Sequence, residues 1–355
     1  MEHSRDVTVA QLDAFDEVID VRSPAEFALD RIPGAINCPV LDDAERARVG
    51  TLYKHESPFA AKRIGAALVA RNIAQIVETR LHDRPRAWTP LVYCWRGGAR
   101  SDALCEVLRR IGWRAARLQG GYQAYRRMVV DALARMPQGF DFRVVCGRTG
   151  SGKSQVLEAL AALGAQVLDL EALACHRGSV LGEVPGQAQP SQKLFESLLW
   201  QRLRALNPAQ PVFVEAESRK VGNVQVPGEL IAAMRAAPCV SIEAPAGVRI
   251  ALLMAQYGHF IANAALLGER LQALTQHYGR TTIARWCAMA QAGSHAELVA
   301  ELLAAHYDPA YDRSLERNFT LAPQAHAFEL HSAAPEAIRA LAASVLSACS
   351  QDQPA

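Results

Sequence analysis

The stretch that decides the fold is Leu91-Val92-Tyr93-Cys94-Trp95-Arg96-Gly97-Gly98-Ala99-Arg100-Ser101. Its apolar first part predicts a buried strand ending at Cys94, and the apolar spacing from Ala103 to Leu108 predicts a helix after the loop. Adjacent glycines let backbone N–H groups point toward one centre, while the helix N-terminus and Arg100 add positive charge. Such surroundings lower the pKa of a thiol. We therefore predict that Cys94 is a reactive thiolate rather than a small buried apolar residue.

Composition indicates a soluble globular protein of about two domains. The chain has 355 residues, of which 50% are hydrophobic and 21% are charged. Its first residues are polar and lack the apolar core of a signal peptide, and no apolar run is long enough to cross a bilayer, so we expect a cytoplasmic protein without membrane contact. The eight cysteines form no CxxC motif, which argues against a zinc site or a disulfide framework.

Positive charge is concentrated after the Cys94 loop. Between Cys94 and Arg127 there are eight arginines and only two acidic residues, a net charge of +6, whereas the whole chain has a net charge of +2. A one-sided charge beside a reactive loop favours an anionic substrate such as a nucleic acid. The alternative is an ordinary solvated surface in a chain that uses few lysines.

The first 135 residues alternate between short apolar runs and helical patterns. Val18–Arg22 predicts a strand, and Ser23-Pro24 with Glu26 predicts the capped start of a helix. Residues 31–39 predict a turn into another short strand, and residues 112–122 predict one more strand and a Gly-Gly turn. This alternation predicts a small parallel α/β domain over residues 1–135, because the chain loosens around Met136–Gly139.

A second motif opens the domain that we predict over residues 136–355. The apolar run Phe142–Cys146 leads into a GxxxxGK[ST] sequence and then a helical pattern, which is the strand–loop–helix setting of a P-loop. Backbone N–H groups of such a loop bind phosphate oxygens. Lys153 would reach the outer phosphate. Ser154 would be able to hold Mg²⁺, and the sequence suggests no other metal. The predicted diphosphate-binding residues are Gly147, Gly150, Ser151, Gly152, Lys153 and Ser154.

A later apolar run, Pro211–Val214, ends at Glu215, the place of a Walker B acid in P-loop proteins. We expect Glu215 and Glu217 to act on Mg²⁺ or water. Arg219 and Lys220 would either face anions or form a solvated pair, and the sequence favours neither. From Val248 the pattern is mostly helical, with a late strand and a last helix.

The first domain resembles the rhodanese domain. The resemblance lies in Asp20–Phe27, Ile32–Asn37, the Cys94 loop and Leu118–Tyr122, in that order. It implies a cysteine that carries sulfur, or selenium in its place. The loop here is Cys-x5-Arg, one residue longer than in the usual sulfurtransferases, and is similar to the loop of rhodanese-fold phosphatases. We expect Cys94 and Arg100 to be catalytic, with an oxyanion loop formed by Trp95, Arg96, Gly97, Gly98 and Ala99.

Both domains together resemble the tRNA 2-selenouridine synthase family. Besides the two loops, the resemblance rests on Glu-Ala-Glu-Ser-Arg-Lys-Val-Gly at residues 215–222 and His-Tyr-Asp-Pro-Ala-Tyr at residues 306–311. It implies an α/β enzyme, with rhodanese-like and P-loop NTPase-like domains, that replaces the sulfur of a wobble 2-thiouridine (5-methylaminomethyl-2-thiouridine type) by selenium. The implied co-substrates are selenophosphate and geranyl diphosphate, with an S-geranylated intermediate. The implied partners are the anticodon arm of tRNA and a protein that supplies selenophosphate. No tightly bound cofactor is expected.

Three other interpretations remain open from the residues alone. An ATP-dependent sulfurtransferase or kinase would show nucleotide hydrolysis stimulated by substrate. A Cys-x5-Arg phosphatase would form a phosphocysteine. A tRNA-binding scaffold without catalysis would tolerate Cys94→Ser. The sequence does not locate the apolar groove that a geranyl chain needs.

Overall fold

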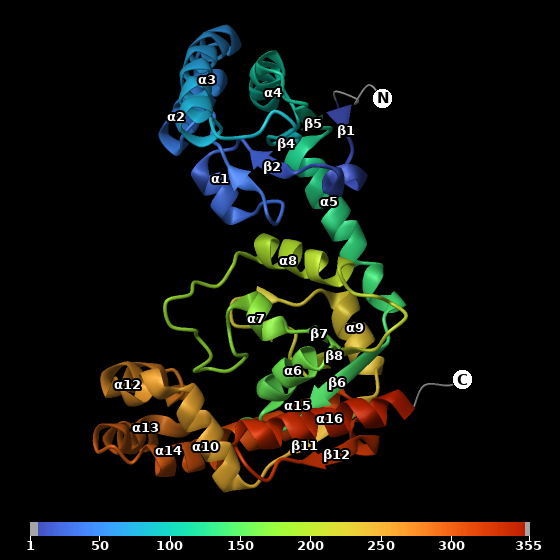
Figure 1. Ribbon diagram of the computed structural model, residues 1–355. Helices are drawn as coiled ribbons and strands as arrows, with labels where there is room; N and C mark the ends of the chain where they lie inside the picture. The colour runs from blue at the N-terminus through green and yellow to red at the C-terminus, as the bar shows by residue number, and fades with distance from the viewer. Residues whose placement is uncertain (1–5, 352–355) are drawn as a thin grey trace. The chain divides into compact units, whose positions relative to one another are not determined.

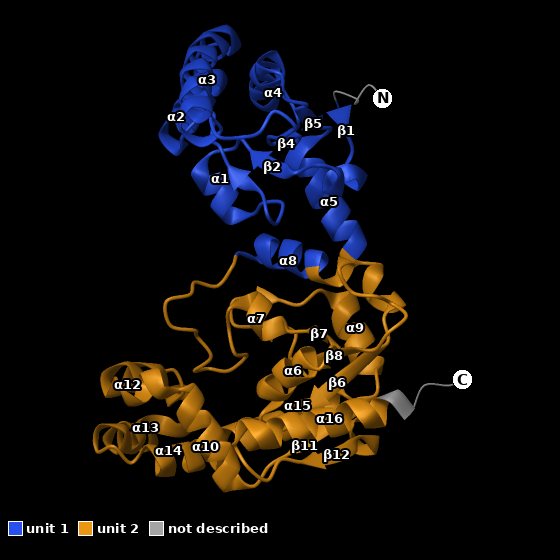
Figure 2. Ribbon diagram, viewed as in Figure 1, with its two compact units in different colours: residues 1–132, 191–201 blue, residues 133–190, 202–355 orange. Residues whose placement is uncertain are grey.

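The computed structural model describes residues 6–351, which form two compact units (Figure 2). The chain passes from the first unit to the second between Ala132 and Leu133, three residues before the boundary expected from the sequence. Ser191–Gln201, which the sequence places in the second domain, is grouped with the first unit.

The first unit is built on a parallel sheet of five strands, in the order β1-β5-β4-β2-β3. The strands are β1 (Asp6–Val7), β2 (Glu17–Asp20), β3 (Ile36–Asn37), β4 (Pro90–Tyr93) and β5 (Ala116–Leu118). All four residues of β4 are buried, as its continuous apolar sequence predicts for a central parallel strand. The predicted α/β alternation is therefore found, with the Cys94 strand at the middle of the sheet.

Helices cover both faces of this sheet (Figure 1). They are α1 (Pro24–Leu29), α2 (Asp43–His55), α3 (Pro58–Arg80), α4 (Ala99–Ile111) and α5 (Gly121–Leu133), after a short 3₁₀ turn at Val9–Ala14. Helix α1 begins with the predicted capping box of Ser23 and Glu26. Helices α3 and α4 share one core, to which they contribute Ile73, Ile76, Leu104 and Leu108.

Helix α8 (Gln192–Arg204) packs its first ten residues in the first unit. The Ser197 hydroxyl donates to Asp30 at 2.8 Å, and the Trp200 ring meets the Tyr125 ring edge-on at 5.7 Å. Arg126 pairs with Glu196. These partners lie 70 or more residues away in the chain, so the local pattern of α8 could not assign it to this unit.

The second unit contains another parallel sheet of five strands, ordered β12-β11-β6-β8-β7. The strands are β6 (Phe142–Cys146), β7 (Gln166–Leu168), β8 (Val212–Glu215), β11 (Cys239–Glu243) and β12 (His326–Glu329), and β9 (Lys220–Val221) and β10 (Val224–Gln225) form a separate hairpin. Strand β6 lies between β11 and β8, so the loop after β6 opens at the centre of the carboxyl edge.

Helices α6 (Lys153–Ala162) and α16 (Pro335–Gln351) pack together against this sheet through Val156, Leu160, Leu341 and Val345. Other helices of the sheet domain are α7 (Leu170–Ala174), α9 (Gly228–Ala236) and α10 (Ala246–Gln256), with 3₁₀ turns at Met136–Gly139 and Ala322–Gln324.

The helical part predicted after Val248 has a core of its own, which includes Phe260, Leu271, Trp286 and Leu298. It comprises α11 (Gly258–Ile261), α12 (Ala264–Gln272), α13 (Thr275–Gln291), α14 (His295–Leu302), a π-helical turn (Leu303–Tyr307) and α15 (Asp308–Asn318). Within residues 6–351 no helix is both long and apolar enough to serve as a membrane span.

Candidate active sites

Cys94 lies directly after β4, at the bottom of the loop that leads to α4, and its side chain is buried. The Gly98 N–H donates to Sγ at 3.3 Å and the Ser101 hydroxyl at 3.2 Å. Burial alone would raise the pKa of this thiol, but the hydrogen bonds from Ser101 and Gly98, with the charge of Arg100, lower the pKa below its ordinary value. The loop thus stabilises the thiolate more than an ordinary cysteine environment does, which is the direction that the loop sequence predicts.

The turn before α5 holds this loop in place. Tyr122 N–H donates to the Cys94 carbonyl at 2.8 Å, and Gln123 N–H to the Trp95 carbonyl at 3.1 Å. A Cβ on Gly121 would lie 2.3 Å from the Cys94 carbonyl oxygen, so only glycine permits this approach. The Trp95 ring packs on the Tyr122 ring with 5.1 Å between centroids.

Arg100 is half-buried and bonds to Glu26 at 3.1 Å, whereas Arg96 is exposed. Glu26 comes from α1, so the first helix fixes the orientation of the arginine that ends the Cys-x5-Arg loop. Gly98 is the N-cap of α4, and Ala99 is its first residue. The predicted loop residues are therefore brought around Cys94, with the Arg100 charge shared by a carboxylate.

A buried ion pair between Arg22 and Asp20 supports the residues that hold the Cys94 loop. Arg22 bonds to Asp20 at 2.6 Å and to the Asp30 carbonyl at 2.6 Å, and its guanidinium lies 4.1 Å from the centre of the Tyr122 ring. The Tyr122 hydroxyl donates to Asp30 at 2.7 Å. The Asp20-Val21-Arg22 motif thus has a structural task, which is to fix the tyrosine that holds the Cys94 loop.

The arginines after Cys94 divide into two groups. Arg100, Arg110, Arg117 and Arg126 form ion pairs with acidic side chains of the same unit, and Arg109 bonds to a backbone carbonyl. The other three, Arg96, Arg114 and Arg127, are exposed. The charge available to an anionic partner is thus smaller than the sequence count of +6 suggests.

The P-loop of the second unit runs from the end of β6 to α6, as its motif predicts. Lys153 Nζ donates to the Gly147 carbonyl at 2.6 Å and lies 5.5 Å from the centre of the Tyr311 ring. Burial lowers the pKa of Lys153, although neighbouring carboxylates oppose this effect. Gly150 has a φ of +79°, which favours glycine, and a Cβ there would meet Leu253 at 2.8 Å.

The carboxyl groups of Glu171, Glu215 and Glu217 lie beside Lys153, and that of Asp169 lies next to Glu171 and Glu215. Glu215 is buried at the end of β8, opposite Val145 of β6, and accepts from the Glu171 N–H at 2.9 Å. Ser154 donates to the Glu171 carboxylate at 3.3 Å. Burial raises the pKa of all four carboxyl groups. Repulsion between the carboxylates adds to the effect at Glu171, Glu215 and Glu217, and the pKa of Glu217 rises to about 8. The site thus holds more acid than Lys153 alone neutralises, which suits a site that takes up cations.

A pocket of about 1300 Å³, counting its part open to solvent, lies over the P-loop and is lined by Gly150, Gly152, Lys153, Ser154 and Glu217. Arg177 also lines it, and its Nη1 is buried without a hydrogen-bond partner. Arg219 and Lys220, which the sequence suggested, are exposed near the β9–β10 hairpin and do not line this pocket. Arg177 could not be singled out from the sequence, because no motif surrounds it.

Comparisons with known proteins match both halves of the chain. Residues 5–128 match the rhodanese-like domain family, and residues 140–266 match the family described as tRNA 2-selenouridine synthase AAA domain. A tRNA 2-selenouridine synthase of Alcanivorax borkumensis is 33% identical over 84% of this chain and 90% of its own length. This chain belongs to the tRNA 2-selenouridine synthase family. The resemblance and the two-domain α/β fold class inferred from the motifs are confirmed.

Other members of the tRNA 2-selenouridine synthase family match over a shorter range. The relative from Nitrosomonas europaea is 36% identical over 68% of this chain, and the one from Marinobacter nauticus is 37% identical over 68%. The chain spans 63% and 65% of the lengths of these two relatives.

In this member of the tRNA 2-selenouridine synthase family, α15 contacts the P-loop directly through Tyr311 and Asp312, and indirectly through Arg249 of α10. The Tyr311 hydroxyl accepts from the Gly147 N–H at 2.6 Å, and Asp312 pairs with Arg148 at 2.7 Å. Arg249 pairs with Asp308 and donates to the Thr149 carbonyl at 2.9 Å. The motif at residues 306–311 therefore orders the phosphate loop.

Proposed function

We propose that this protein replaces the sulfur of a 2-thiouridine in tRNA by selenium. The supporting observation is that similarity to relatives named tRNA 2-selenouridine synthase runs through both domains, with a cysteine loop in one and a P-loop in the other. We extend the proposal to the wobble uridine of the anticodon arm, to the 5-methylaminomethyl-2-thiouridine type, and to a cytoplasmic enzyme.

The first proposed step is S-geranylation at the P-loop. The sulfur of 2-thiouridine attacks C1 of geranyl diphosphate, the C1–O bond breaks, diphosphate leaves with the electron pair, and the uridine N3 proton is lost. A leaving diphosphate must be held and neutralised. Lys153 and Arg177 line the pocket over the loop, which supports this role, and the step needs no nucleotide hydrolysis.

Mg²⁺ fits this site as an additional counter-charge. Ser154 and Glu171 line the P-loop pocket and present oxygen ligands to it. Glu215, whose Oε2 atom is buried without a partner, accepts from the Glu171 N–H. Within residues 6–351 no cluster of three or more His, Cys, Asp or Glu side chains forms a metal cage. Ser154 and Glu171 would therefore hold Mg²⁺ together with the diphosphate oxygens, where the metal would neutralise the leaving group.

The second proposed step is selenation at the Cys94 loop. Selenophosphate adds through selenium to C2 of the geranylated base, the C2–S bond breaks, and geranyl thiol leaves with the electron pair and a proton. Water then cleaves the Se–P bond, which releases phosphate and 2-selenouridine. The loop from Trp95 to Ala99 binds the phosphate oxygens and Arg100 balances their charge. The Cys94 thiolate accepts the proton that selenophosphate loses as it adds, and passes it to the leaving geranyl thiol. Another protein would supply selenophosphate.

The proposal is tested by mass spectrometry of nucleosides from thiolated tRNA after incubation with the purified protein. Geranyl diphosphate alone is expected to yield S-geranyl-2-thiouridine, and both co-substrates together 2-selenouridine. Inorganic diphosphate in place of geranyl diphosphate is the control and should leave 2-thiouridine unchanged. Selenium incorporation that depends on ATP and ignores geranyl diphosphate would overturn the proposal in favour of nucleotide-driven chemistry.

A further inference from the structure

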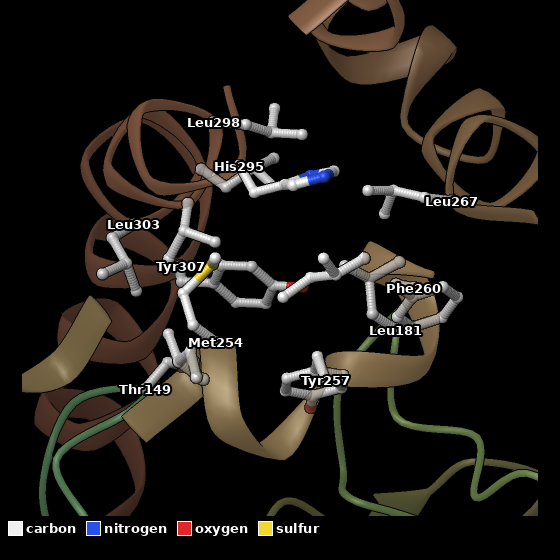
Figure 3. Close-up of a pocket in the computed structure, with 15 residues that line it drawn as sticks. Thr149, Leu181, Met254, Tyr257, Phe260, Leu267, His295, Leu298, Leu303 and Tyr307 are labelled. Atoms are coloured by element: carbon white, nitrogen blue, oxygen red, sulfur yellow. The ribbon is translucent and has the colours of Figure 1, made fainter. Parts of the chain in front are cut away.

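An apolar pocket lies in the helical part of the second unit (Figure 3). It encloses about 600 Å³, counting the part open to solvent. Its walls include Leu181, Met254, Phe260, Leu267 and Leu303, so most of the lining is aliphatic or aromatic. A ligand of this pocket must bring an apolar body, since few polar groups face it.

The apolar pocket adjoins the P-loop pocket. Thr149, Ser179, Leu253, Tyr257 and Tyr307 line both. Thr149 is itself a P-loop residue, directly before Gly150. One ligand can therefore place a phosphate group on the loop and an apolar chain behind it.

Polar side chains mark the junction between the two pockets. The Arg177 guanidinium lies 5.1 Å from the centre of the Tyr257 ring, and its buried Nη1 has no partner. The Tyr257 and Ser179 hydroxyls are 3.5 Å apart. The junction thus offers an unpaired cationic donor where the polar head of a ligand would meet its apolar tail.

We propose that the apolar pocket binds the geranyl chain while the P-loop, with Arg177, binds the diphosphate, and that the residues at the far end of the pocket limit chain length. This inference rests on the proposed function, because that function supplies the ligand. Burying a branched ten-carbon chain contributes affinity in proportion to the apolar area removed from water. It also keeps water from C1, where hydrolysis would compete with transfer.

The far end is formed by the helices beyond α10. In Figure 3 Thr149 lies at one side of the pocket and Leu298, His295 and Leu267 lie at the other. Leu303 and Tyr307 enter the wall from the π-helical turn before α15, a rare form that is frequent at functional sites. That turn leads directly into the helix that contacts the P-loop, which couples the shape of the pocket to the phosphate site.

Calorimetric binding of geranyl diphosphate and of inorganic diphosphate tests the pocket. We expect the wild-type protein to bind geranyl diphosphate at least about tenfold more tightly, the order expected from burying several methylene groups. Met254→Trp fills the pocket from a half-buried position and should remove this preference while inorganic diphosphate still binds. Met128→Trp, at a half-buried position of α5 in the first unit, does not line the pocket; it is the matched control and should behave as wild type.

Equal affinities of the wild-type protein for the two ligands, or an unchanged preference in Met254→Trp, would overturn the inference. Leu267→Ala tests the far end, since it should improve binding of farnesyl diphosphate relative to geranyl diphosphate. An unchanged ratio of these two affinities would show that Leu267 does not limit chain length. Binding and transfer are separable outcomes. A wild-type protein that binds geranyl diphosphate through this pocket but transfers nothing to thiolated tRNA would leave the pocket assigned and refute the proposed function.

Discussion

At the scale of single residues, two hydrogen bonds to one sulfur lower the pKa of the Cys94 thiol. The Ser101 hydroxyl and the Gly98 N–H stabilise the thiolate against the cost of burial. Burial without such donors has the opposite effect, because it raises the pKa of Cys38 to about 11 and the pKa of Cys105 to about 12. Burial therefore raises the pKa of these two core thiols, whereas the hydrogen bonds of the loop lower the pKa of Cys94, which we expect to be the reactive thiol.

Ser101→Ala should raise the pKa of Cys94, because the hydroxyl hydrogen bond favours only the thiolate. The rate of iodoacetamide labelling of the Cys94 peptide, followed by mass spectrometry against pH, measures this pKa. We expect the wild-type midpoint to lie below the ordinary value of about 8.5 and the variant midpoint to lie above the wild-type one. Ser344→Ala, at an exposed serine of α16, is the control. Identical profiles for wild type and Ser101→Ala would contradict this account of the thiol.

Residues within a contiguous motif could be predicted from the sequence, whereas residues that act through the fold could not. Cys94 and Lys153 are recognisable by their neighbours in the chain. Tyr311 reaches the Gly147 N–H across 164 residues, and Arg177 lies in a loop without any recognisable pattern. The exposed Arg219 illustrates the converse, since charge beside a motif does not by itself place a side chain in the pocket.

At the scale of elements, α15 determines the shape of the P-loop through ion pairs of unequal burial. The Arg249–Asp308 pair is 8% and 19% exposed, whereas the Arg148–Asp312 pair is 53% and 41% exposed. Removing one partner of a buried pair leaves a charge without compensation, but an exposed charge stays solvated.

Asp308→Ala should therefore lower the free energy of unfolding by about 3 kcal/mol, and Asp312→Ala by less than about 1 kcal/mol. Urea unfolding followed by circular dichroism measures both. The two variants lie one turn apart on the same helix, so each controls for the other. Equal losses would mean that Arg249 does not depend on Asp308 for its charge compensation.

The order of strands and helices follows largely from local patterns, which is why both parallel sheets were predictable. Buried parallel strands such as β4 and β8 have unbroken apolar sequences, and the capping box at Ser23 marks the start of α1. The placement of α8 and the apolar pocket were not predictable. Both depend on tertiary contacts between segments whose own sequences are ordinary amphipathic helices.

At the scale of the whole molecule, the proposed tRNA substrate requires an anion-binding surface. Arg96 of the Cys94 loop and the later Arg114 and Arg127 are exposed, and among residues 6–351 they form no ion pair with an acidic side chain. The other arginines of that stretch bond within their own unit. Charged contacts of this kind release counterions from the nucleic acid, which makes the affinity depend on salt.

Raising salt from low to physiological concentration should weaken tRNA binding by more than about tenfold, measured by fluorescence anisotropy. Changing Arg96, Arg114 and Arg127 together to glutamine should reduce the slope of log affinity against log salt by about one for each arginine that binds a phosphate. Arg110→Gln, which removes an arginine paired with Glu106, is the control and should change the slope less. A salt-independent affinity would contradict a phosphate-binding role for these arginines.

The central claim is that the P-loop and the Cys94 loop perform successive steps on one base, and nucleoside mass spectrometry of two variants tests it most directly. Thiolated tRNA is incubated with geranyl diphosphate and selenophosphate in each case. Cys94→Ser is expected to accumulate S-geranyl-2-thiouridine without 2-selenouridine, and Lys153→Ala is expected to leave 2-thiouridine unmodified. Full selenium incorporation by Cys94→Ser, or normal geranylation by Lys153→Ala, would contradict the account.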